Sequence, residues 1–174
     1  MIPRLKVTAH NEPGWNYNLW KSAFHPITER LGAGYMVYNQ RIVPVSFNDD
    51  RMEGYWALRR DAIVIDASAE KAIEIAGPDA EAPLDRAMTR DLTRLKPGRA
   101  LYALVFWKDG GLVSDGVLLR LAHDRFWYVS GCGEVQAWLT ALGMGMNVRV
   151  SDPDVSVLAI QGPEALDVLA AAIP

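Results

Sequence analysis

Asp115 is the one carboxylate in two predicted strands, residues 101–107 and 112–121, that are otherwise rich in Val, Leu and aromatic side chains. An ionised carboxylate buried without a partner either costs several kcal/mol or shifts its pKa. We therefore expect Asp115 to be partly buried or to lie at the floor of a pocket, against a polar group. Since a carboxylate only accepts hydrogen bonds, it can bind the N–H groups of a ligand; the alternative is a structural acid that caps a loop or pairs with an Arg.

A hairpin brings Tyr102 near this carboxylate. The run Lys-Asp-Gly-Gly between the two strands is a turn signal, which makes the strands antiparallel. If Trp107 pairs with Leu112, then Leu104 faces Asp115 and Tyr102 is the diagonal neighbour of the acid. Period-two alternation puts the following side chains on one face: Tyr102, Leu104, Phe106, Val113, Asp115 and Val117.

The spacing of the His, Cys and Gly residues does not indicate a further site. His10, His25 and His123 lie far apart, with no Cys or acid at ligand spacing, so we expect no metal. Cys132 has no His placed to activate it, so we expect an inert thiol. No glycine-rich pattern typical of nucleotide binding occurs.

The composition indicates one domain and a small-molecule or protein partner. The chain has 174 residues, is 50% hydrophobic and carries a net charge of -3, with no run of Lys or Arg. Binding to nucleic acid or to an anionic membrane needs a basic patch, so we expect neither partner. The formation of a homo-oligomer is possible on this composition. A single Cys and the lack of a signal segment or long apolar span favour a cytoplasmic location.

The pattern along the chain predicts an α+β fold with mixed or antiparallel sheets. Residues 1–24 form an N-terminal arm, and residues 25–174 form the folded part. Strands are predicted at residues 35–45, 62–66, 71–76, 101–107, 112–121, before Gly131, and at 155–160, with Pro44 on a sheet edge. Helices are predicted at residues 51–60, 82–88, 133–142 and 163–173.

Residues 72–80 and residues 157–165, which lie 85 residues apart, share one motif: a strand, then Gly-Pro, an acid and the start of a helix. The Gly allows a tight turn, while Pro and the acid suit the first helical turn. The second copy reaches Pro174 without the segments that follow the first copy. An apolar face must be covered, so we expect a truncated fold from a longer protein; the alternative is a short domain whose last helix ends there.

A series of short motifs follows in order: Tyr55, Leu58-Arg59, Asp66-Ala-Ser68, Gly77-Pro-Asp-Ala80, Asp91-Leu92, Leu95-Lys-Pro-Gly-Arg-Ala100, Tyr102, Asp109-Gly-Gly111, Asp115 and Gln161-Gly-Pro163. In this order and spacing the chain resembles the folate-dependent aminomethyltransferase family, which includes the glycine-cleavage T-protein, from about Tyr35 onward. Residues 25–33, 38–44, 126–138 and 151–156 are most similar to the dimethylsulfoniopropionate demethylase branch. Gly131 replaces a folate-facing Asn of the T-protein pattern, and Ser114 replaces the first acid of its Asp-Asp pair.

The resemblance implies an aminomethyltransferase folate-binding fold with tetrahydrofolate as cofactor. It implies Asp115 as the catalytic residue and the following as folate-binding residues: Tyr102, Asp115, Ser130 and Gly131. An onium methyl donor would favour an aromatic wall and an Arg for its carboxylate, and the candidates are Tyr35, Trp107, Trp127 and Arg30, with Arg41 as an alternative to Arg30. Each aromatic residue can instead serve simple core or rim packing.

The expected function is therefore a tetrahydrofolate-dependent methyltransferase that demethylates a small donor such as dimethylsulfoniopropionate and yields methyl-tetrahydrofolate. Two alternatives stay open: aminomethyl transfer in glycine cleavage, and a non-catalytic folate-binding module. The identity of the donor rests on similarity to one branch. We expect the chain alone to be inactive, because the family pattern places much of the donor pocket beyond it.

Overall fold

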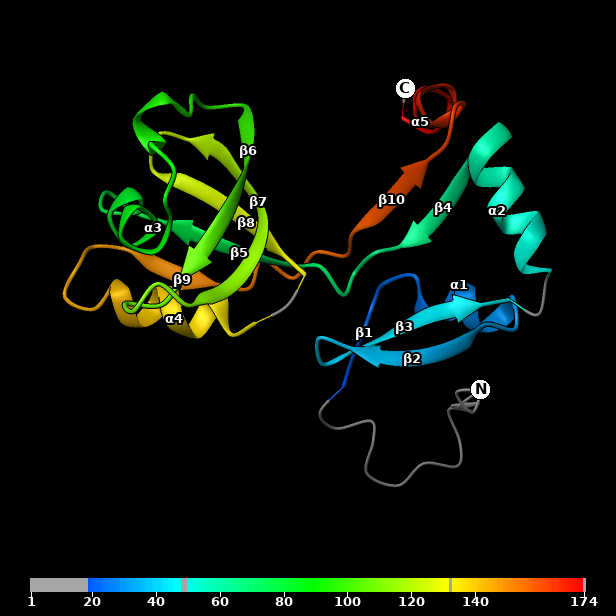
Figure 1. Ribbon diagram of the computed structural model, residues 1–174, viewed down its shortest axis with the longest axis horizontal. Helices are drawn as coiled ribbons and strands as arrows, with labels where there is room; N and C mark the ends of the chain where they lie inside the picture. Colours follow the sequence, from blue (N-terminus) through cyan, green and yellow to red (C-terminus); the bar gives the residue numbers. More distant parts are fainter. Residues whose placement is uncertain (1–18, 48–49, 132, 174) are drawn as a thin grey trace. The chain divides into compact units, whose positions relative to one another are not determined.

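The computed structural model describes residues 19–47, 50–131 and 133–173, which form two compact units (Figure 1). The first unit contains residues up to Ala69 and from Ser156 onward, and the second unit is Glu70–Val155. Most of the predicted N-terminal arm lies outside the described residues. Within the described part of the chain, no helix is long and apolar enough to cross a membrane.

The second unit is built on a five-stranded antiparallel sheet with the strand order β6-β7-β8-β5-β9. Its strands are β5 (Lys71–Ala76), β6 (Arg99–Phe106), β7 (Leu112–Ala122), β8 (Arg125–Ser130) and β9 (Arg149–Ser151). Its helices are α3 (Glu81–Ala87), α4 (Val135–Leu142) and the short 3-10 helix η1 (Leu92–Arg94).

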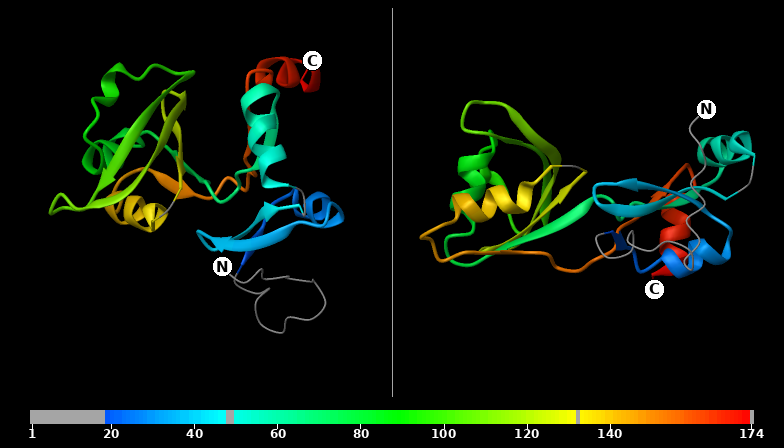
Figure 2. Two further views of the ribbon diagram at one scale, coloured as in Figure 1. Left: turned by 45° about the vertical axis from the view of Figure 1, so that its right-hand side comes forward. Right: turned by 90° about the horizontal axis from the view of Figure 1, so that it is seen from below.

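One face of this sheet packs against α3 and α4, which also contact each other (Figure 2). Alternation along β8 directs Phe126 and Tyr128 into this core, where both are 0% exposed. Leu84 from α3 and Leu139 from α4 complete the core from the helical side. The residues of β6, β7 and β8 between the core positions must therefore lie on the opposite face of the sheet.

The first unit contains two smaller sheets, of order β1-β3-β2 and β10-β4. Its strands are β1 (Trp20–Lys21), β2 (Gly34–Tyr38), β3 (Arg41–Ser46), β4 (Ile63–Asp66) and β10 (Leu158–Gln161). Its helices are α1 (His25–Arg30), α2 (Arg51–Arg60) and α5 (Ala165–Ala172). A short hydrogen bond from Ser22 Oγ to Asp66 Oδ2 ties the segment before α1 to the end of β4.

The predicted α+β class with mixed and antiparallel sheets is confirmed: among the described strands, β1 and β3 are parallel and the other pairs are antiparallel. The helix at 51–60 and the strand at 71–76 have the predicted bounds. The side chain of Asp50 caps the helix by accepting a 2.9 Å hydrogen bond from Met52 N, and Glu53 lies in its first turn.

Two predictions of detail are wrong. Pro44 lies in β3, the middle strand of its sheet, and is tolerated there because β1 pairs only with Arg41 and Ile42. Leu112 pairs with Phe106 and not with Trp107, because a β-bulge follows Val105. In addition, helix α1, the 3-10 helix η1 and strands β1 and β9 were not predicted.

Candidate functional site

Tyr102 and Asp115 lie on neighbouring strands of the second unit and form a hydrogen-bonded pair. The Tyr102 hydroxyl donates to Asp115 Oδ2 at 2.5 Å. As predicted, Leu104 is the residue opposite Asp115, and Tyr102 is paired with Val117. The hydrogen bond to the Asp115 carboxylate raises the pKa of Tyr102, so the phenol stays protonated and can donate.

Asp115 is exposed, so the prediction that it is partly buried is wrong. Its side chain lies on the face of the sheet opposite α3 and α4, where Tyr102 is 52% exposed and Val117 39% exposed. By contrast, Ala103 and Val105 on the covered face of β6 are 1% and 0% exposed. We call the uncovered side the Asp115 face and define it by Tyr102, Asp115, Val117, Leu119 and Trp127.

Ser130 points to the covered side of the sheet. Its hydroxyl lies 2.7 Å from Ser114 Oγ, and both side chains are buried. Ser114 Oγ also donates to the carbonyl oxygen of Asp115 at 3.2 Å. Ser130 is the last residue of β8 and is paired with Gly116, so Gly131 follows directly after the strand. The Ser130 hydroxyl therefore lies on the side of the sheet away from the Asp115 carboxylate.

Trp127 lies on the Asp115 face and is held by Glu74, a residue that the sequence did not single out. Trp127 Nε1 donates to Glu74 Oε2 at 3.0 Å, and the two residues are directly paired across β8 and β5. Arg125 and Arg149 form ion pairs with the same carboxylate. The hydrogen bond from Trp127, followed by the contacts with Arg125, lowers the pKa of Glu74.

Trp107 lies at the hairpin end of the second unit, with its ring centre 4.6 Å from that of Trp138 in an edge-to-face contact. Trp138 Nε1 donates to the carbonyl oxygen of Phe106 at 3.0 Å, which fixes the second ring. Trp107 itself is 43% exposed. It can therefore present a ring surface to a ligand, supported from behind by Trp138.

The two remaining predicted residues, Tyr35 and Arg30, belong to the first unit. Tyr35 is 6% exposed; its hydroxyl lies 2.8 Å from Thr28 Oγ1, and its ring centre is 4.8 Å from that of His25. Burial raises the pKa of Tyr35 and lowers that of His25. Arg30 is exposed at the end of α1. These contacts make Tyr35 part of the packing of its own unit.

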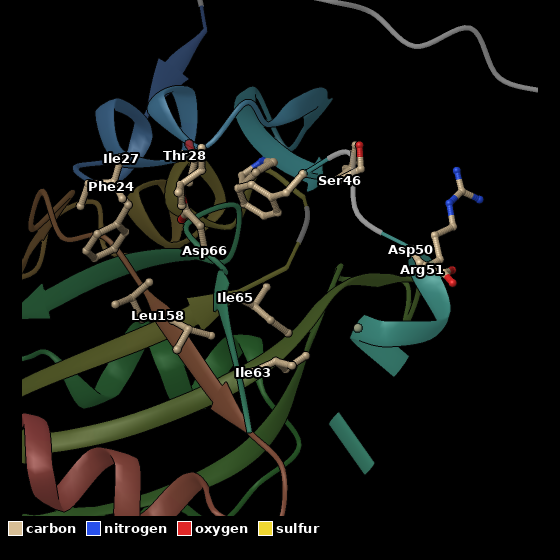
Figure 3. A pocket seen from close by; sticks show the side chains of 16 residues that line it. Phe24, Ile27, Thr28, Ser46, Asp50, Arg51, Ile63, Ile65, Asp66 and Leu158 are labelled. Atoms are coloured by element: carbon tan, nitrogen blue, oxygen red, sulfur yellow. The ribbon is translucent and has the colours of Figure 1, made fainter. Parts of the chain in front are cut away.

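The first unit also contains a cavity of about 600 Å³ that the sequence did not predict (Figure 3). Its walls are mainly apolar and include Phe24, Ile27, Ile65 and Leu158, with Asp66 among the polar residues. They come from segments far apart in the chain, which is why no local pattern signals the cavity. Cys132 lies outside the described residues, and among the described ones no three His, Cys, Asp or Glu side chains form a group that could hold a metal.

The exposed Tyr102–Asp115 pair makes the Asp115 face the candidate binding face of the second unit. The sequence pattern of the GCVT N-terminal domain family matches residues 24–174, and the chain belongs to this family. The crystal structure of glycine cleavage system aminomethyltransferase T from Bartonella henselae is similar, with a TM-score of 0.81 and 29% identity. The match covers 88% of this chain and 44% of that one.

Curated relatives carry several names. The chain is 33% identical to the heme-dependent oxidative N-demethylase gamma subunit of Ectopseudomonas mendocina, over 90% of this chain and 42% of that protein. It is 33% identical to dimethylsulfoniopropionate demethylase DmdA of Ruegeria pomeroyi, over 79% and 38%. It is 35% identical to an aminomethyltransferase of Bacillus velezensis, over 87% and 42%. The chain thus spans less than half the length of these relatives.

These findings confirm the predicted family and its fold, in the N-terminal part of its members. Tetrahydrofolate is the cofactor of this family, as the resemblance implied. The residues of the Asp115 face fit such a group, because an exposed carboxylate beside a Tyr and apolar side chains suits a flat ring with N–H donors.

Proposed function

We propose that the chain carries one wall of the tetrahydrofolate site of a cytoplasmic one-carbon transferase. The reaction is transfer of a methyl group from a small donor such as dimethylsulfoniopropionate to a ring nitrogen of tetrahydrofolate, which yields methyl-tetrahydrofolate. The C–S bond of the donor breaks, its sulfur keeps the electron pair and leaves as a thioether, and the ring nitrogen loses its proton. The observation that carries the proposal is the 2.5 Å hydrogen bond between Tyr102 and Asp115 on the uncovered face of the family's domain.

Asp115 has one oxygen engaged and one free for a ligand. Oδ2 accepts from Tyr102, so Oδ1 can accept an N–H of a reduced pterin. Tetrahydrofolate, when bound, supplies the ring nitrogen that receives the methyl group. The carboxylate contributes by holding the ring in the orientation from which that nitrogen can attack, and Tyr102 contributes by fixing the carboxylate.

For the methyl donor, the proposal relies on an aromatic side chain of the second unit. Trp107 is exposed, so its ring can attract an onium group. Trp127, which was also predicted as a donor residue, lies on the Asp115 face assigned to the pterin and is not used for the donor. Arg30, the residue predicted to pair with a donor carboxylate, belongs to the first unit, and that pairing stays a prediction. Tyr35 is not used in the proposal, because its ring is buried and its hydroxyl is paired with Thr28.

Aminomethyl transfer is the second candidate. Its support is the 35% identity to an aminomethyltransferase of Bacillus velezensis. Against it stand Gly131, at the position of a folate-facing Asn, and Ser114, at the position of an acid; here Ser114 is buried and bonded to Ser130. A folate-binding module without catalysis is the remaining alternative.

The test combines binding and turnover. Tetrahydrofolate is titrated calorimetrically into the full-length protein and its Asp115→Ala variant, and methyl transfer by the full-length protein is followed with sulfonium, glycine-type and aryl-ether donors. We expect the variant to bind about ten- to a hundredfold more weakly, the range for a hydrogen bond to a charged group. Turnover with a sulfonium would support demethylation, while binding without turnover would favour the module. Absence of binding together with unchanged transfer in the variant would refute the proposal.

A further inference from the structure

We propose that Glu74 is a positioning residue: it holds the indole of Trp127 in a fixed orientation, so that the ring forms an aromatic wall of the Asp115 face for the pterin. This inference rests on the proposed function. It assigns a role to a buried acid of β5 that touches neither Asp115 nor Tyr102 in the described contacts.

The contacts of Glu74 are directed at one ring and two guanidinium groups. Oε2 accepts from Trp127 Nε1 at 3.0 Å and from Arg125 Nε at 2.7 Å, while Oε1 accepts from Arg149 Nη2 at 3.2 Å. An indole has a single N–H donor, so a hydrogen bond at this group directs that edge of the ring toward β5. The orientation of the ring is thereby determined by Glu74.

Glu74 is buried although it lies on the uncovered side of the sheet. Its side chain is 8% exposed, whereas those of Arg125 and Arg149 are 50% and 72% exposed. A buried carboxylate is tolerated only where it is paired and hydrogen-bonded. The two Arg residues supply the charge, and the indole N–H supplies the one neutral donor. The pKa of Glu74 is lowered by these contacts, so the acceptor stays ionised at neutral pH.

The sheet register connects Trp127 to the Tyr102–Asp115 pair. Trp127 is paired with Leu119 on β7, and two positions further along the same face Val129 is paired with Val117. Val117 is in turn paired with Tyr102. Trp127 and Tyr102 are thus the aromatic residues on either side of a strip of apolar side chains, with the acid at its end. A flat ring lying on this strip would contact both.

A purely structural role is the alternative, in which the same contacts only join β5, β8 and β9. Three variants separate the two roles. Glu74→Gln keeps an acceptor for the indole but loses the charge that both Arg residues need. Glu74→Ala removes both the acceptor for the indole and the charge. Glu81→Gln is the matched control, because it breaks another ion pair of the second unit, Arg120 with Glu81 at 3.0 Å, away from the Asp115 face.

The experiment measures the Kd of tetrahydrofolate by calorimetry for these variants, for Trp127→Leu and for the double variant Glu74→Ala with Trp127→Leu. Positioning predicts that Glu74→Ala and Trp127→Leu each weaken binding about three- to tenfold, the range of an aromatic contact. It also predicts that the double variant is no weaker than either single one, because the two residues act as a unit. Glu74→Gln should restore most of the affinity, and Glu81→Gln should leave it unchanged.

Other results would overturn the inference. If Glu74→Ala and Glu74→Gln lose affinity equally, or if the losses in the double variant add, Glu74 does not act through the indole. If Asp115→Ala weakens binding while Glu74→Ala does not, the inference fails and the proposed function stands. If the unaltered protein binds no tetrahydrofolate, the proposed function fails and this inference fails with it.

Discussion

The two strand-Gly-Pro-helix devices, β5 with α3 in the second unit and β10 with α5 in the first, share one turn. Gly77 and Gly162 have φ angles of +135° and +127°, which L side chains rarely adopt. A Cβ on Gly77 would lie 2.4 Å from the carbonyl oxygen of Asn147, and one on Gly162 would lie 2.4 Å from that of Asp61. In both copies a neighbouring chain segment therefore crosses directly over the glycine.

The two copies differ in how they are covered. β5 is paired on both edges, with β8 and β9, whereas among the described residues β10 is paired only with β4. Leu84 in α3 is 0% exposed, while its counterpart in the repeat, Leu169 in α5, is 40% exposed. The comparison shows that the repeated sequence determines the turn, and that burial of the following helix depends on the strands around it.

The largest expected difference between the copies is in the helices. Leu84→Ala should lower the free energy of unfolding of the second unit by about 2–5 kcal/mol, because a fully buried side chain leaves a cavity. Leu169→Ala should cost about 1 kcal/mol or less, because much of its surface is already in water. Urea unfolding followed by circular dichroism measures both. Equal losses would mean that α5 is as well packed as α3.

The glycines should behave alike in both copies. Gly77→Ala and Gly162→Ala should each cost about 1–3 kcal/mol, the range for a residue forced into a rarely populated backbone conformation. Hydrogen exchange of each unit measures the local loss. Gly54→Ala in α2 is the control, since a Cβ there meets nothing within 4 Å, and it should be neutral or stabilising. A loss in only one copy would show that the turns are not equivalent.

The two units should also differ in their response to acid. Burial, with Lys21 nearby, lowers the pKa of His25 below its ordinary value of 6.5, although Glu29 and Asp66 oppose the shift. The unfolded chain then binds a proton more readily than the folded unit, so stability of the first unit is lost as the pH falls below about 6.5.

In the second unit, Glu74 has a pKa below its ordinary value of 4.5. The contribution of Glu74 to the free energy of unfolding is present above that pH and is lost as the pH falls further. The second unit should therefore stay folded at a lower pH than the first unit. Hydrogen exchange at a series of pH values tests this order. His25→Phe should remove the loss in the first unit at mildly acidic pH and leave the second unit unchanged.

Local sequence patterns predicted the parts of the fold that depend on near neighbours. The helix at 51–60 has its cap at Asp50, and the hairpin places Leu104 opposite Asp115 by alternation alone. Helix α1 has six residues; Pro26 at its start and Arg30 in its last turn were the signals that could have found it.

The site could be predicted only in part. Tyr102 and Asp115 are 13 residues apart within one hairpin, so their pairing follows from local register. Trp127 and Glu74 are 53 residues apart, and nothing local links them. The exposure of Asp115 could not be predicted either, because an apolar strand does not reveal which of its faces the helices cover.

Tetrahydrofolate, in our proposal, binds to the Asp115 face of the second unit. The direct measurement is a titration of the ¹⁵N-labelled protein with tetrahydrofolate, followed by amide chemical shifts in each unit. We expect the shifts to change at Tyr102, Asp115, Trp127 and Gly131, and Asp115→Ala to require about a ten- to hundredfold higher tetrahydrofolate concentration for the same changes. Changes confined to the cavity of the first unit, or the same changes at the same concentrations in the variant, would contradict this proposal.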